Sequence, residues 1–126
     1  MKISIVSITT ALLLLASSPA DAWRIRLYEN TNYGGRQVTY SGPGNTGSKC
    51  FSNIDPLNNK VSSIQYYAYN SDRTTRCCLT LYDSPGCKTK NADWTPQKSC
   101  HDEKWTKIPA TWNNDISSFK TTCHAV

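Results

Sequence analysis

The stretch NNKVSSI at residues 58–64 is followed, 55 residues later, by NNDISSF at residues 113–119. A second pair lies upstream, because RIRLYE at residues 24–29 is matched by CLTLYD at residues 78–83, 54 residues later. Self-similarity at a fixed spacing is the signature of a fold built from equivalent units. The sequence therefore contains two copies of a unit of about 50 residues.

Both copies begin with the alternation of a half-buried β-strand. Apolar side chains occupy every second position there: Trp23, Ile25 and Leu27 in the first copy, Cys77, Leu79 and Leu81 in the second. This period of two is typical of strands. Turn residues separate the strand-like segments, and no window carries the apolar stripe of an amphipathic helix. Short strands in two equivalent halves predict an all-β sandwich of two antiparallel sheets.

The first 22 residues have the features of a secretory signal peptide. Lys2 supplies a positive charge, residues 11–16 are apolar, and Ala20 and Ala22 are small residues placed for cleavage. The apolar run is too short to cross a bilayer. We predict cleavage after Ala22, secretion to the extracellular space, no transmembrane segment and one domain at residues 23–126.

All six cysteines follow the predicted cleavage site: Cys50, Cys77, Cys78, Cys87, Cys100 and Cys123. An even number in a short exported chain indicates disulfides, for which 15 full pairings exist. Cys77 and Cys78 are adjacent, so on a strand they point to opposite faces and should take different partners. The spacing of the cysteines and histidines does not favour a zinc site.

Two motifs resemble the βγ-crystallins. One is YENTNYGG at residues 28–35, which suits a folded hairpin in which one ring packs across the turn and Gly35 takes a conformation closed to other residues. The other is the repeated NNxxSS loop, which in that family contributes calcium ligands in each Greek key. The resemblance implies a βγ-crystallin-like sandwich of two Greek keys, at about 23–70 and about 77–123.

The resemblance also implies ligands for up to two calcium ions, shared between the loops. One site would use the backbone carbonyls of Glu29 and Lys60, the hydroxyl of Ser62 and the side chain of Asn114. The other would use the carbonyls of Asp83 and Asp115, the hydroxyl of Ser117 and the side chain of Asn59. Five residues would be structural: Tyr28, Tyr33, Gly35, Ser63 and Ser118. Calcium prefers such oxygen ligands, and the low carboxylate content predicts low affinity.

The second copy departs from the motif, because Cys87 stands where the first copy has Tyr33. We expect a disulfide to hold this hairpin in place of an aromatic contact. Cys87–Cys100 is the pairing we predict, since both cysteines would flank adjacent strands.

The same residues also allow other interpretations. Asn, Asp and Ser also stabilise tight turns through their own backbone, so the loops would then be purely structural. The formal net charge of +5 suits a cell-wall or membrane surface, or an antimicrobial, killer-toxin-like, effector or protease-inhibitor role on the same fold. Trp94, Trp105, Trp112 and the tyrosines at residues 66–69 fill the core or form a binding surface.

No catalytic constellation is evident. His101 and His124 are the only histidines, and neither lies in a pattern that marks a serine triad. No glycine-rich phosphate loop is present. We therefore predict a non-enzymatic, monomeric protein with calcium as its partner and no nucleic-acid partner.

Overall fold

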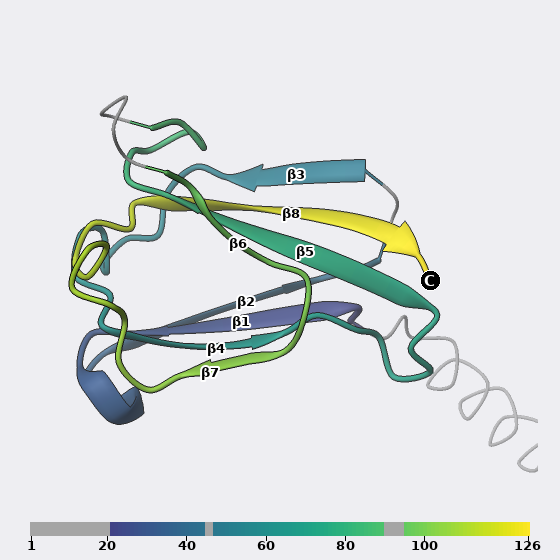
Figure 1. Ribbon diagram of the computed structural model, residues 1–126, viewed down its shortest axis with the longest axis horizontal. Coiled ribbons are helices and arrows are strands. Elements are labelled where there is room, and N and C mark those ends of the chain that lie inside the picture. The colour runs from purple at the N-terminus through teal and green to yellow at the C-terminus, as the bar shows by residue number, and fades with distance from the viewer. Residues whose placement is uncertain (1–20, 45–46, 90–94) are drawn as a thin grey trace, which may run out of the picture.

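A computed structural model describes residues 21–44, 47–89 and 95–126. Two four-stranded antiparallel sheets lie face to face (Figure 1). One sheet has the order β2-β1-β4-β7, with bounds Gln37–Gly42, Trp23–Tyr28, Ser63–Tyr67 and Glu103–Trp105. The other has the order β3-β8-β5-β6, with bounds Gly47–Phe51, Ser118–Ala125, Thr75–Tyr82 and Gln97–Ser99. A short 3-10 turn, η1, spans Thr31–Tyr33. The predicted all-β sandwich is confirmed.

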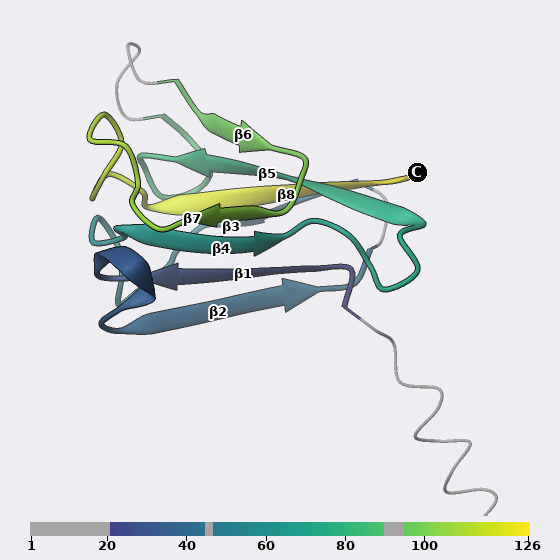
Figure 2. The same ribbon diagram turned by 60° about the horizontal axis from the view of Figure 1, so that its bottom comes forward.

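The two sequence copies exchange strands. β3 belongs to the first copy but pairs with β8 of the second, and β7 of the second copy pairs with β4 of the first. Each sheet therefore contains three strands of one copy and one of the other, as the turned view shows (Figure 2). This exchange decides which segments of the two copies become neighbours.

One hydrophobic core lies between the sheets. The alternating apolar positions of β1 and β5 point into it, and Ile25, Leu27, Leu79 and Leu81 are fully buried. Each such side chain contributes roughly 1.5–3 kcal/mol on burial. Trp112 packs edge-on against the half-buried Trp105, with ring centroids 5.5 Å apart. Both belong to the core rather than to a binding surface, whereas Trp94 lies outside the described residues.

Three disulfides join all six cysteines: Cys50–Cys87, Cys77–Cys123 and Cys78–Cys100. The adjacent Cys77 and Cys78 take different partners, as predicted. The predicted Cys87–Cys100 pairing is wrong. Strand exchange brings Cys50 on β3 beside the second hairpin, and Cys100, just after β6, reaches Cys78 on the neighbouring β5. The second hairpin is nevertheless held by a disulfide.

Candidate metal centre

The two NNxxSS loops meet at one end of the sandwich, on the left in Figure 1. The backbone N–H of Asn59 donates to the carbonyl of Ile116 at 2.9 Å, and that of Asn114 donates to Val61 at 3.2 Å. Asn59 and Asn114 both adopt left-handed conformations, with φ of 57° and 62°. Asparagine tolerates this region better than most residues. The loops are thus equivalent in structure and bonded to each other.

The second asparagine of each loop contacts a serine of the other loop. The Ser117 hydroxyl donates to Oδ1 of Asn59 at 2.9 Å, and the Ser62 hydroxyl donates to Oδ1 of Asn114 at 3.4 Å. Ser62 and Ser117 are largely buried. The fold therefore gathers, at two places, the side-chain oxygens that the family resemblance assigns to two ions.

The residues expected to offer backbone carbonyls lie around these pairs. The N–H of Ser62 donates to the carbonyl of Tyr28 at 2.9 Å, and that of Ser117 donates to Tyr82 at 2.9 Å. Glu29 and Asp83 directly follow those tyrosines. Lys60 and Asp115 are exposed at equivalent positions of the two loops.

The charge differs between the surroundings of the Ser62–Asn114 pair and those of the Ser117–Asn59 pair. Arg36 forms an ion pair with Glu29 at 2.7 Å. The hydrogen bond from Arg36, and then the positive charges of Arg36 and Lys60, hold the pKa of Glu29 below its ordinary value. Beside the Ser117–Asn59 pair, Asp115 occupies the position that Lys60 has beside the Ser62–Asn114 pair. Arg36 was not predicted as a site residue, although a hairpin that returns seven residues after Glu29 was a possible signal for this pair.

A folded hairpin covers the first loop, held by an aromatic pair and a serine. The rings of Tyr28 and Tyr33 lie 5.3 Å apart. The Ser63 hydroxyl accepts the N–H of Tyr33 at 3.0 Å and donates to the carbonyl of Asn30. Gly35 has φ of +75°, and an added Cβ would lie 2.8 Å from the Asn30 side chain, so any other residue would be strained there.

The second hairpin uses the same serine contacts. The Ser118 hydroxyl accepts the N–H of Cys87 at 2.9 Å and donates to the carbonyl of Ser84. Cys87 occupies the position of Tyr33, and its side chain is bonded to Cys50 instead of packing on a ring.

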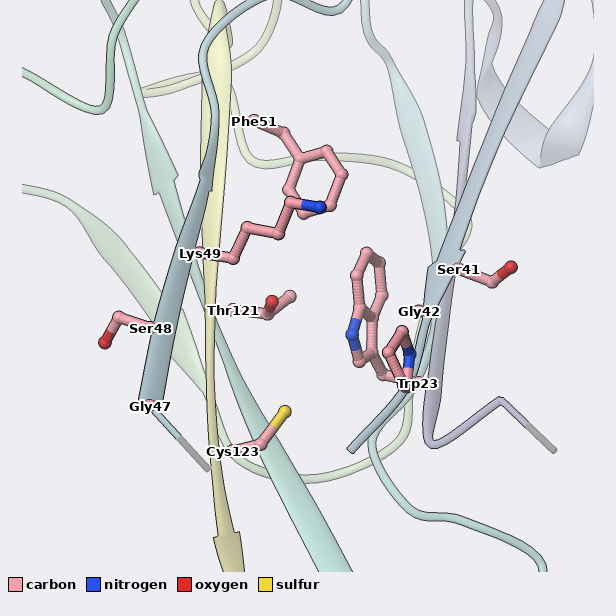
Figure 3. Close-up of a pocket in the computed structure, with 10 residues that line it drawn as sticks. Trp23, Ser41, Gly42, Gly47, Ser48, Lys49, Phe51, Thr121 and Cys123 are labelled. Carbon is pink, nitrogen blue, oxygen red and sulfur yellow. The ribbon is translucent and has the colours of Figure 1, made fainter. Parts of the chain in front are cut away.

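A cavity of about 240 Å³ opens elsewhere, between the edge strands β2 and β3 (Figure 3). Lys49 and Thr121 point into it, whereas Ser41 and Ser48 point away. None of the predicted metal ligands lines this cavity. Among the described residues, no group of three or more His, Cys, Asp and Glu side chains is placed to hold a metal ion. A metal at the loops would therefore rely on amide, hydroxyl and backbone oxygens.

Solved structures share this architecture. A βγ-crystallin from an archaeon is similar over 78% of this chain and 95% of its own, with a TM-score of 0.54 and 20% identity. A βγ-crystallin from Ciona intestinalis is similar over 76% of this chain and 95% of its own, with a TM-score of 0.51 and 21% identity. A mutant βγ-crystallin domain from Clostridium beijerinckii is similar over 78% of this chain and 95% of its own, with a TM-score of 0.50 and 18% identity. The chain has the βγ-crystallin fold.

No family model and no curated protein matches the chain. The βγ-crystallin fold is retained here with three disulfides, which are typical of proteins from oxidising compartments. No helix in the described part of the chain is long and apolar enough to span a membrane.

Proposed function

We propose that this protein is a secreted, non-enzymatic structural protein of the βγ-crystallin type that binds up to two calcium ions with low affinity. The observation that carries the proposal is the contact of each loop serine with the asparagine of the other loop. Disulfides and bound calcium would together stabilise the extracellular protein.

The spacing of these oxygens suits a shared ion. Calcium holds its oxygen ligands at about 2.3–2.6 Å, so adjacent ligands around one ion lie roughly 3 Å apart. The serine and asparagine oxygens are separated by 2.9 Å in one pair and 3.4 Å in the other. The carboxamide oxygen of Asn58, in the same region, is buried and has no hydrogen-bond partner among the described residues. The spacing of these side-chain oxygens therefore supports calcium as the shared ligand.

The two sites differ in expected affinity. Calcium affinity rises with the negative charge around the ion. The site of Asn59 and Ser117 is accompanied by Asp115, whereas the site of Ser62 and Asn114 is accompanied by Lys60. We assign the tighter site to Ser117.

Calcium binding at this level would stabilise the fold rather than act as a sensitive switch. With a dissociation constant of ~0.1 mM, typical of weak extracellular sites, and calcium at ~1 mM, one site adds about 1.4 kcal/mol to the free energy of unfolding. That gain is a substantial part of the stability of a small domain.

Thermal melts of the oxidised protein in EDTA, calcium and magnesium test the proposal. Calcium, but not magnesium, should raise the melting temperature, and calorimetry should show weaker binding in Ser62→Ala and Ser117→Ala, with the larger loss in Ser117→Ala. No calcium shift would reduce residues 58–63 and 113–118 to structural turns. Growth inhibition of yeasts and filamentous fungi would then be the next assay, because the net charge of +5 also suits an antimicrobial or effector role.

A further inference from the structure

The outward positions within the strands of the β2-β1-β4-β7 sheet carry only positive charge. Directly paired residues of antiparallel strands point to the same side, and the register places Arg26, Gln65 and Lys104 in one row across β1, β4 and β7. Arg24 pairs with Tyr67 in a second row. Figure 2 brings this sheet forward. No Asp or Glu occupies an outward position on these four strands. The outward residues of β1 and β4 alternate with buried, inward-facing ones: Ile25, Leu27, Ile64 and Tyr66.

These cations have no acidic partner among the residues that the structure describes. The one ion pair within the described residues joins Arg36 to Glu29, so Arg24, Arg26 and Lys104 make none. Arg24 and Arg26 are two residues apart on one strand, about 6.7 Å along the sheet, and Lys104 lies two strands, about 9.6 Å, from Arg26. Three cations that form no ion pair among the described residues thus follow a path over a polar surface.

A small cavity opens at one end of this path. It has a volume of about 180 Å³ and is lined by Asp21, Trp23, Arg24, Tyr67 and Tyr69. The two tyrosines are half-buried, so part of each ring is accessible. The guanidinium of Arg73 stacks on the Tyr69 ring, 4.0 Å from its centroid, and adds a second cation. Asp21 precedes the predicted cleavage site, so the carboxylate that stays at this end is that of Asp102, which accepts the N–H of Ala68 at 2.7 Å.

The folded hairpin closes the opposite end of the face. Tyr33 packs on Tyr28, and the Tyr28 hydroxyl donates to the side chain of Gln65 at 3.1 Å. The accessible part of the face therefore runs from Gln65 to Tyr67, where β4 ends, and Tyr69 follows two residues later.

The outer face of the other sheet offers a weaker site. It also carries basic residues, but its Arg76 guanidinium is bonded to His124 at 3.0 Å. Two disulfides, Cys50–Cys87 and Cys78–Cys100, involve its outward positions. None of the described cavities is lined by Lys98 or Lys120 of that face.

The chemistry of the first face suits a hydrophilic polyanion rather than a lipid surface. Val126 is the one large apolar side chain that is strongly exposed among the described residues, so this face has no apolar group to insert into a bilayer. Guanidinium groups pair with carboxylates through two parallel hydrogen bonds. Tyrosine rings offer an apolar surface with a hydroxyl at the tip, which matches a sugar ring bearing a carboxylate.

We propose that the outer face of the β2-β1-β4-β7 sheet binds an acidic polysaccharide. One uronate unit would lie against Tyr67 and Tyr69, with its carboxylate on Arg24, and the chain would continue toward Arg26 and Lys104. This site is separate from the calcium loops and goes beyond the proposed function.

Binding of polygalacturonate to the oxidised mature protein, residues 23–126, tests the proposal. The variant Arg24→Gln/Arg26→Gln/Lys104→Gln should bind about tenfold more weakly or worse, since charge-assisted hydrogen bonds are lost. The matched control Lys88→Gln/Lys98→Gln/Lys120→Gln loses the same charge elsewhere and should keep binding within about threefold. Tyr67→Ser should also weaken binding. Its melting temperature, which should be unchanged, is the control for folding.

Equal losses in the two triple variants would overturn the proposal in favour of non-specific charge attraction. Absence of binding to polygalacturonate, tighter binding to a neutral glucan, or tighter binding to vesicles of phosphatidylserine would also overturn it. Calcium-dependent melting of the same variants reports on the loops independently, so a failure here is distinguishable from a failure of calcium binding.

Discussion

The two Greek-key copies fold their hairpins alike but fix them by different means. In the first copy Tyr33 packs on Tyr28, and in the second Cys87 is bonded to Cys50 on an exchanged strand. Tyr33 and Cys87 share a left-handed conformation, with φ of 61° and 58°. Each backbone N–H is accepted by the serine that ends its loop motif. The serine and the backbone conformation define the hairpin, whereas the side chain that fixes it is replaceable.

The largest effect should come from removing the covalent restraint. Cys50→Ala/Cys87→Ala opens a disulfide whose cysteines are 37 residues apart, and chain-entropy arguments give a loss of about 3–4 kcal/mol. Tyr33→Ala should cost only about 1–2 kcal/mol, because it removes one partly exposed ring and its contact with Tyr28. Urea unfolding of both variants, with the other disulfides intact, measures the difference. Equal losses of stability would show that the disulfide and the aromatic contact stabilise their hairpins to the same extent.

A second comparison concerns the charge beside the two candidate calcium sites. Lys60→Asp gives the first loop the charge of the second and should raise the calcium affinity of the Ser62 site roughly tenfold. Titration calorimetry in EDTA-stripped buffer measures this change, and Lys98→Asp, on β6, controls for the change in net charge. An equal gain in the control would attribute the effect to the charge of the whole protein.

The smallest effect is expected at the Arg36–Glu29 pair. Arg36→Gln removes the hydrogen bond and charge that lower the pKa of Glu29, so this pKa should rise toward its ordinary value. A pKa depressed by folding stabilises the protein above the pKa of the unfolded chain, and that contribution disappears as the pH falls through the folded-state pKa. NMR titration of the Glu29 carboxylate measures the shift. An unchanged pKa would mean that Arg36 is not its main partner in solution.

The repeat in the sequence located the equivalent positions well, because both copies use the same backbone contacts. Ser63 and Ser118 could be paired at an offset of 55, and the structure shows them in matching hydrogen bonds. The disulfide of Cys87 could not be predicted in this way. Its partner depends on the exchange that places β3 beside β8, and sequence alignment of the copies carries no information on that exchange. Arg36 was missed because its contact depends on how the hairpin folds back.

The disulfides also decide how a mechanical load would pass through the molecule. A force applied between the two ends would follow the chain to Cys50, cross to Cys87, return along the chain to Cys77 and cross again to Cys123. The segments 51–76 and 88–122 lie outside this covalent path. Pulling would therefore detach β1 and β2 from their sheet. The Cys50–Cys87 and Cys77–Cys123 disulfides would then prevent further extension. The loops that carry the candidate calcium ligands, at residues 58–63 and 113–118, lie within the shielded segments.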